Sequence, residues 1–89
     1  MRPLVATSGF RRDVKRLKKR GADLTRLIAT IEAIQAKGAP PASARPHLLR
    51  GAWAGHLECH IAPDWLLIYQ VDAEEVRLYR TGTHSDLFG

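Results

Sequence analysis

The spacing of apolar residues changes from a helical period to a strand period along this chain, and this change limits the folds that it can adopt. Up to residue 38 the apolar residues recur every three or four positions, as on one face of a helix. From residue 57 they alternate with polar residues, as on one face of a strand. A chain of 89 residues has room for one hydrophobic core. We therefore expect a single α+β domain over residues 1–89.

The first half is expected to hold a short strand and two helices. An apolar strand over 4–6 precedes a helix over 9–20, for which Ser8 is the expected N-cap. A second helix over 24–37 ends at Gly38, a residue type that favours a helix C-terminus. The break between the two helices is short, so we expect them to form a hairpin.

Three strands are expected in the second half, after a proline-rich loop over 38–46. The strands at 57–61, 65–71 and 76–80 are separated by short turns and so form an antiparallel meander. The almost wholly apolar segment 65–71 is typical of a central strand. Residues 81–89 are expected to be a tail without a further element.

The predicted order of elements is β-α-α-β-β-β, an antiparallel sheet with the helix hairpin packed on one face. No helix remains to cover the other face, which is therefore expected to be at least partly open to a partner. Along strand 57–61 the side chains alternate between the two faces of the sheet. The core face is expected to carry Leu57, Cys59 and Ile61, and the open face to carry His56, Glu58 and His60.

The single cysteine, Cys59, excludes both a disulfide framework and a cysteine-based structural zinc cluster. The N-terminus has no long apolar segment typical of a secretion signal. No part of the chain approaches the roughly 18 apolar residues that a membrane span requires. We therefore expect a cytoplasmic protein that does not contact a membrane.

Positive charge is concentrated at the front of the chain. The net charge is +5, but residues 1–20 alone sum to +7 and residues 21–89 to −2. Such asymmetry favours a polyanionic partner, because Lys and Arg side chains that neutralise phosphates release counterions. The alternative is a solvated face that only keeps the protein soluble. The basic residues of the predicted first helix are Arg11, Arg12, Lys15, Arg16, Lys18, Lys19 and Arg20.

Four histidines are the side chains best suited to proton transfer near neutral pH: His47, His56, His60 and His84. A zinc deaminase site would need a downstream Pro-Cys-x-x-Cys pair, and Cys59 is the only cysteine. No glycine-rich phosphate loop followed by Lys-Ser/Thr is present. Cys59 is expected in the core, and no serine has the setting of a catalytic nucleophile. Cleavage of RNA by its own 2′-OH needs a base, an acid and cations, and neither metal nor cofactor. Histidines and a carboxylate near a basic surface supply those parts.

Several segments resemble the YafQ branch of the RelE-like bacterial toxins. They are Phe-Arg-Arg-Asp-Val-Lys at 10–15, Gly-Ala-Trp-Ala-Gly at 51–55, Glu-Cys-His-Ile-Ala-Pro-Asp-Trp-Leu-Leu-Ile-Tyr at 58–69, and Arg-Thr-Gly-Thr-His-Ser-Asp-Leu-Phe-Gly at 80–89. The resemblance covers nearly the whole chain and implies a RelE-like fold. It also implies the toxin of a type II toxin–antitoxin module, a ribosome-dependent mRNA interferase that cuts mRNA in the ribosomal A site. The partners implied are a cognate antitoxin and the ribosome with its mRNA, with operator DNA contacted only through the antitoxin.

The resemblance also assigns roles to individual residues. The expected catalytic residues are His47, His60, Asp64 and His84, with His84 as the general acid and the others activating the 2′-OH or positioning the phosphate. The expected supporting residues are Trp65 and Phe88, which stack on a base or only pack, and Arg80, which stabilises phosphorane charge or is structural. Glu58 is expected to orient His60, and His56 to be a surface residue. The residues expected to grip ribosomal RNA phosphates are Arg11, Arg12, Lys15, Lys18 and Lys19.

Two other functions remain open on the sequence. A non-catalytic basic module that binds RNA or the ribosome would account for the first helix, but it would not need His60, Asp64 and His84. The second of these functions is that of a degenerate toxin, which retains only antitoxin binding. RelE-like toxins outside the YafQ branch use lysine, arginine and tyrosine chemistry, so their mechanism is not carried over.

Overall fold

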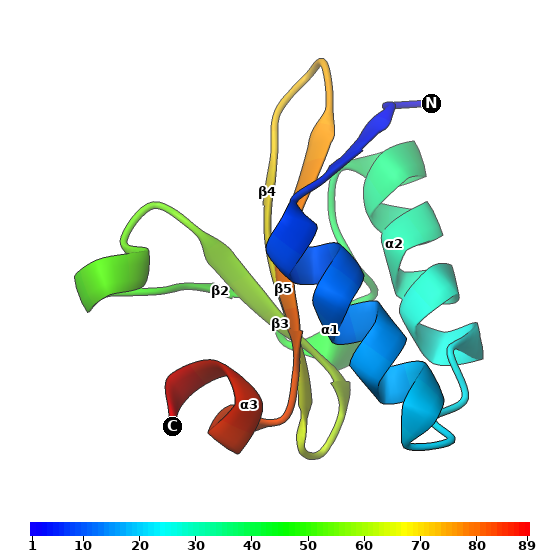
Figure 1. Cartoon of the computed structure of the whole chain (residues 1–89). Helices are drawn as coiled ribbons and strands as arrows, with labels where there is room; N and C mark the ends of the chain where they lie inside the picture. Colours follow the sequence, from blue (N-terminus) through cyan, green and yellow to red (C-terminus); the bar gives the residue numbers. More distant parts are fainter.

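A five-stranded sheet forms the centre of the computed structural model, which describes all 89 residues (Figure 1). The strand order is β1-β5-β4-β3-β2, so β4 is the middle strand, as predicted for segment 65–71. Strands β3, β4 and β5 pair antiparallel, and β2 pairs antiparallel with β3. The strands are β1 (Leu4–Ala6), β2 (His47–Leu48), β3 (Leu57–Ala62), β4 (Trp65–Val71) and β5 (Val76–Gly82).

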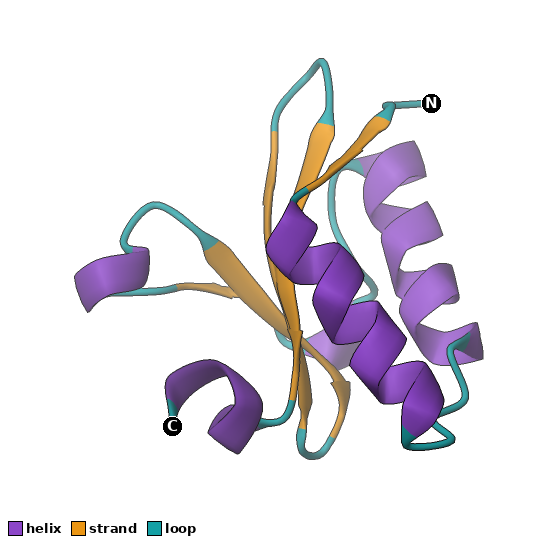
Figure 2. Cartoon of the chain, viewed as in Figure 1, coloured by secondary structure: helices purple, strands orange, loops and turns teal.

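Two long helices, α1 (Ser8–Lys19) and α2 (Thr25–Lys37), lie on one face of the sheet (Figure 2). Their apolar side chains meet those of the strands in one core, which confirms the predicted helix hairpin and the α+β class. The buried core residues are Phe10, Leu27, Ile31, Ile34, Ala44, Cys59, Ile61, Leu67, Tyr69, Val76 and Leu78.

Cys59 lies wholly inside this core, as its place in the strand alternation predicts. Burial raises the pKa of its thiol to about 12. The thiol therefore stays protonated near neutral pH and serves as a small apolar side chain rather than a nucleophile.

The ends of α1 and α2 differ in how well the sequence predicted them. The N-cap of α1 is Thr7, not Ser8: the Thr7 hydroxyl accepts a hydrogen bond from the Phe10 amide at 3.0 Å and donates one to the Tyr79 carbonyl at 2.8 Å. The second bond, to β5, is a tertiary contact that sequence alone does not contain. Gly38 ends α2 in the left-handed conformation at φ 78°, as predicted.

Four further elements were not predicted. Strand β2, the 3₁₀ turns η1 (Ala42–Ala44) and η2 (Gly51–Trp53), and helix α3 (His84–Phe88) are each five residues or shorter. No apolar period can be recognised over so few residues. The segment 81–89, expected to be an irregular tail, is therefore in part helical. Strand β1 also departs from the antiparallel prediction, because it pairs parallel to β5.

The second face of the sheet is less open than expected. Helix α3 lies on the side of the sheet away from α1 and α2 (Figure 1). On β4, Leu66 and Ile68 alternate with the core residues Leu67 and Tyr69, and yet both are fully buried. The second face is thus partly covered, and polar side chains stand at its margin. None of the helices combines the length and the apolar character that crossing a membrane would take.

Candidate active site

Three of the four histidines meet on the second face of the sheet. His47 comes from β2, His60 from β3 and His84 from the first position of α3. The ring centroids of His47 and His60 are 6.5 Å apart, and those of His60 and His84 are also 6.5 Å apart. Strands β2 and β3 pair with His47 opposite Glu58, which lies two residues before His60, so His47 and His60 are diagonal neighbours on the same face. The structure thus brings together three residues predicted as catalytic.

Asp64, the fourth residue predicted as catalytic, holds His84. It lies in the turn between β3 and β4, and its Oδ1 is 2.7 Å from Nδ1 of His84 and 3.1 Å from the His84 amide nitrogen. Hydrogen bonding from His84 lowers the pKa of the Asp64 carboxyl. An ionised carboxylate accepts from Nδ1–H, which leaves Nε2 of His84 as the ring nitrogen for proton transfer.

Glu58 contacts His47 rather than His60, which corrects the expected pairing. Its Oε1 is 3.2 Å from Nε2 of His47, while Nδ1 of His47 is 3.3 Å from the Arg45 carbonyl oxygen. Both ring nitrogens of His47 therefore face oxygen acceptors, and only the protonated imidazole donates to both at once. The Glu58 carboxyl group is itself buried, so it is held in place behind the ring.

His60 is the central member and is bound by no other side chain. It is half-buried between the rings of His47 and His84. The arrangement offers one free imidazole, one held by a carboxylate and one facing two acceptors, which are suitable parts for acid–base chemistry.

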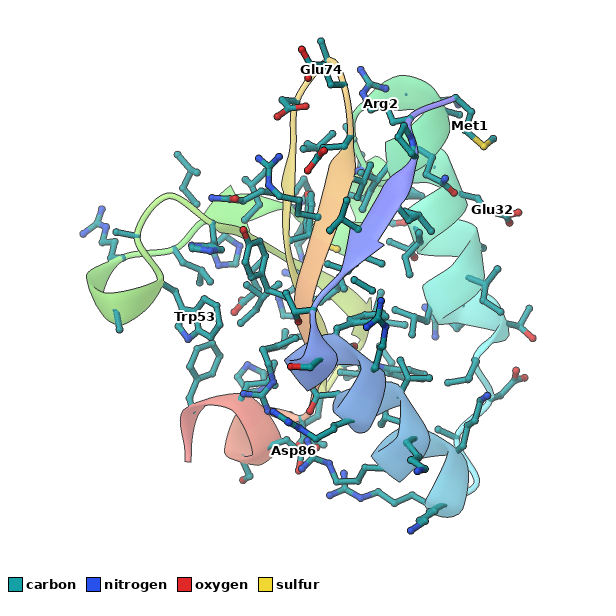
Figure 3. The ribbon with its side chains drawn as sticks, turned by 45° about the horizontal axis from the view of Figure 1, so that its top comes forward. Met1, Arg2, Glu32, Trp53, Glu74 and Asp86 are labelled. Carbon is teal, nitrogen blue, oxygen red and sulfur yellow. The ribbon has the colours of Figure 1, made fainter.

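Helix α3 is held in place by a contact that the sequence did not reveal. Arg20, the C-cap of α1, donates from Nη1 and Nη2 to the two carboxylate oxygens of Asp86 at 2.8 and 2.9 Å. Asp86 also closes a capping box with Thr83, and Figure 3 shows it in the space between α3 and α1. These bonds hold the pKa of Asp86 well below its usual range. The end of α1 thereby fixes the helix that carries His84.

Of the two roles predicted for Arg80, its contacts favour the structural one. Its Nε and Nη2 donate to the carboxylate of Asp13 at 2.6 and 3.1 Å. Asp13 is 2% exposed and also accepts from the Thr81 amide at 3.0 Å. The sequence contained a sign of this role, because Asp13 is the one acidic residue of a basic helix and lies on the same face as Phe10 and Leu17.

The two aromatic residues predicted as supports differ in exposure. Trp65 donates from Nε1 to the Thr81 hydroxyl at 2.9 Å and packs against the core, so its ring supports the fold. Phe88, at the end of α3, is 48% exposed and free to contact a base.

A second aromatic group lies beside the histidines. The half-buried His56 ring contacts Tyr79 edge-on at 4.5 Å between centroids and Trp53 at 5.2 Å. Trp53 lies on the same side of the sheet as α3 (Figure 3). His56, expected to be a surface residue, is thus a packing residue, and it is not in ring contact with the other three histidines.

The five basic residues predicted to bind ribosomal RNA are exposed on α1, and none of them forms a salt bridge within the protein. The other two basic residues of this helix region, Arg16 and Arg20, are paired with Asp13 and Asp86. The unpaired residues are Arg11, Arg12, Lys15, Lys18 and Lys19. A charged surface without internal partners is free to meet phosphates.

No three His, Cys, Asp or Glu side chains are grouped closely enough to hold a metal ion. In the histidine cluster, each of the two carboxylates contacts a single imidazole: Glu58 contacts His47, and Asp64 contacts His84.

Comparisons with known proteins agree over nearly the whole chain. A family model described as "Bacterial toxin of type II toxin-antitoxin system, YafQ" matches residues 2–89. The chain is similar to the mRNA interferase toxin YafQ of Escherichia coli strain K12, at 38% identity over 81 residues, which are 90% of this chain and 88% of that protein. Its fold is similar to the crystal structure of YafQ from E. coli strain BL21(DE3), with a TM-score of 0.91, 34% identity and 100% of both chains covered. It is also similar to a chain in the crystal structure of the E. coli DinJ–YafQ toxin–antitoxin complex, with a TM-score of 0.88, 36% identity, and 99% of this chain and 98% of that chain covered.

Proposed function

This chain belongs to the YafQ family of bacterial toxins of type II toxin–antitoxin systems, and from that premise we propose that it is an mRNA interferase, an endoribonuclease that cuts mRNA in the ribosomal A site. The observation that carries the proposal is the cluster of His47, His60 and His84, in which Asp64 orients His84 at 2.7 Å. A non-catalytic RNA-binding module would have no use for an imidazole oriented in this way.

The proposed reaction is attack of a 2′-OH on the neighbouring phosphorus. His60, which no side chain holds, takes the 2′-OH proton as the new O–P bond forms. His84 gives a proton from Nε2 to the departing 5′ oxygen as the old O–P bond breaks. The products are a 2′,3′-cyclic phosphate and a 5′-OH, and the two protons balance. The division of roles rests on the hydrogen bond of His84 to Asp64.

His47 supports the charged transition state in this proposal. Its ring faces Glu58 on one side and the Arg45 carbonyl on the other, an arrangement that suits the imidazolium. A positive charge next to the phosphate stabilises the charge that develops on its oxygens. The reaction as proposed uses no metal and no cofactor, because base, acid and cation are all side chains.

The ribosome supplies substrate position in this proposal. The unpaired basic residues of α1 bind ribosomal RNA phosphates, and this binding brings the histidines to the mRNA in the A site. Binding of this kind weakens steeply as the salt concentration rises. In this proposal the ribosome brings the mRNA strand to the histidines, which lie at the surface of the toxin.

A cognate antitoxin is the second proposed partner. A related toxin is found with its antitoxin in the DinJ–YafQ complex, and this chain covers 98% of that toxin chain. We expect operator DNA to be contacted only through the antitoxin.

The experiment that tests the function maps mRNA cuts by primer extension in a purified translation system. The wild-type protein is compared with His84→Ala and, as a matched control, His56→Gln, which changes a histidine that contacts Trp53 and Tyr79 instead. Codon-periodic cuts by the wild type and the control, lost in His84→Ala with its circular dichroism unchanged, are expected. Ribosome binding without cutting by the folded wild type would instead favour the non-catalytic module or a degenerate toxin.

A further inference from the structure

A groove beside His60 has no role in the proposed reaction. It has a volume of about 290 Å³ and is lined by Arg26, Ser43, Arg45, His60, Ile61, Ala62 and Pro63. A second hollow of about 220 Å³ shares Arg26, Ser43, His60 and Ile61 with it and continues along α2 and η1. The groove thus joins the beginning of α2, the turn η1 and the edge of β3, and His60 lies at its end.

The groove carries positive charge that nothing in the protein neutralises. The side chains of Arg26 and Arg45 are exposed and take part in no hydrogen bond or salt bridge, and no Asp or Glu lines either hollow. In contrast, five other arginines are engaged with carboxylates or carbonyl oxygens: Arg2, Arg16, Arg20, Arg77 and Arg80. Two free guanidinium groups and the Ser43 hydroxyl are donors suited to the oxygens of a phosphate.

The backbone at Arg45 connects the groove to the histidine cluster. Arg45 is the only residue other than glycine with positive φ, at 49°. Its amide closes η1 by donating to the Ala42 carbonyl, and its own carbonyl faces Nδ1 of His47. Arg45 therefore lines the groove with its side chain and contacts the candidate catalytic residue His47 with its carbonyl. Backbone strain of the kind found at Arg45 is common at ligand sites.

From these contacts we infer that the groove binds the mRNA phosphate next to the one that is cut, with Arg26 and Arg45 as its ligands and Ser43 as a further donor. This inference rests on the proposed function, because it places the same RNA strand across His60. A volume of 290 Å³ is about ten times the share of one water molecule in the liquid, enough for a phosphate and part of its ribose. Arg26 and Arg45 are therefore substrate-positioning residues, distinct from the basic residues of α1.

Binding is tested first without the ribosome. An RNA trinucleotide with 2′-deoxyribose at its first two positions, which the proposed reaction cannot cut at either linkage, is titrated into the protein and followed by NMR. Shifts of the amides of Ser43, Arg45 and His60 are expected, and they are expected to be lost in the variant Arg26→Ala/Arg45→Gly. Glycine is used at position 45 because it adopts positive φ without strain. The absence of shifts in the folded wild type would overturn the inference, whether or not the protein cuts mRNA.

Cleavage in the translation system is the second test. Arg26→Ala and Arg45→Gly are each expected to raise the toxin concentration for half-maximal cutting about tenfold, since a charge-assisted hydrogen bond contributes about 1.4 kcal/mol or more. Arg50→Ala is the matched control, because Arg50 is exposed, unpaired and outside the groove. Unchanged cutting by both groove variants would overturn the inference. A tenfold loss of affinity for ribosomes that carry no mRNA would also overturn it, because the bound phosphate would then belong to ribosomal RNA.

Discussion

Asp64 and His84 form the contact on which the proposed chemistry most depends. Asp64 accepts two hydrogen bonds from His84, one from the ring and one from the backbone. The carboxylate therefore fixes which ring nitrogen of His84 faces it and the direction of the imidazole, as carboxylates bonded to other functional histidines do. The sequence predicted both residues through a family resemblance. Their contact could not be predicted, because 20 positions separate them and α3 was not foreseen.

Asp64→Asn is expected to reduce the single-turnover cleavage rate at least about a hundredfold, the usual range for loss of a working general acid. The amide is close in size to the carboxylate, and its Oδ1 can still accept from Nδ1 and from the His84 amide, but it has no negative charge to stabilise the imidazolium from which the proton is given. The hydrogen bond at Nδ1 is read from the ¹⁵N shifts of the ring. A normal rate with this bond intact would show that proton donation by His84 does not depend on the charge of Asp64.

The pH dependence of this contact follows from the lowered pKa of Asp64. A carboxyl whose pKa is lower in the folded than in the unfolded state stabilises the fold above the unfolded value, about 3.9, and this contribution is lost as the pH falls through the lowered value. The bond between Asp64 and His84 is therefore expected to persist at pH 4. Loss of the hydrogen-bonded Nδ1–H proton signal of His84 already near pH 5, followed by NMR, would contradict this expectation.

At the level of elements, the long ones were predictable and the short ones were not. The apolar spacing placed α1, α2 and the three main strands, since each runs long enough to show a period. Strand β2 has two residues and α3 has five, and these carry His47 and His84. The site was thus predictable as a set of residues but not as an arrangement. One local sign was available, because Thr83 and Asp86 have the spacing of a capping box.

The contact between Arg20 and Asp86 leads to a prediction about α3. Arg20→Ala is expected to speed amide hydrogen exchange in α3 and to lower the rate of cleavage, because a five-residue helix is not stable without outside support. Arg20→Lys is expected to restore part of both effects, since a lysine keeps the charge but not the two parallel bonds. Lys37→Ala, at the far end of α2, is the control. Fast exchange in α3 with a normal cleavage rate would show that the position of His84 does not depend on this contact.

For the whole molecule, the unpaired positive charge and His84 lie on different elements. The unpaired basic side chains lie along α1, whereas α3, which begins with His84, lies on the other side of the sheet (Figure 1). The proposed binding of ribosomal RNA and the proposed chemistry therefore use different parts of the fold. The composition predicted a polyanionic partner, but it could not separate the five unpaired residues of α1 from Arg16 and Arg20, whose partners come from the fold.

The triple variant Arg11→Glu/Arg12→Glu/Lys15→Glu is expected to bind ribosomes more weakly and with a smaller dependence on salt. Each phosphate contact that is lost reduces the slope of log K against log salt concentration by about 1. Binding is measured by cosedimentation between about 50 and 200 mM salt, the range over which such contacts weaken strongly. The thermal transition of the variant is the control for folding. Equal slopes for the variant and the wild type would place the ribosome contact elsewhere.

Whether the 2′-OH is the nucleophile is measured with mRNA that carries a single 2′-deoxyribose on the 5′ side of the bond that is cut. The wild-type protein on programmed ribosomes is expected to cut the unmodified message to a 2′,3′-cyclic phosphate and a 5′-OH, and to leave the modified linkage intact. Cutting at the modified linkage would rule out the proposed reaction, because the nucleophile would then not be the 2′-OH that His60 is proposed to activate.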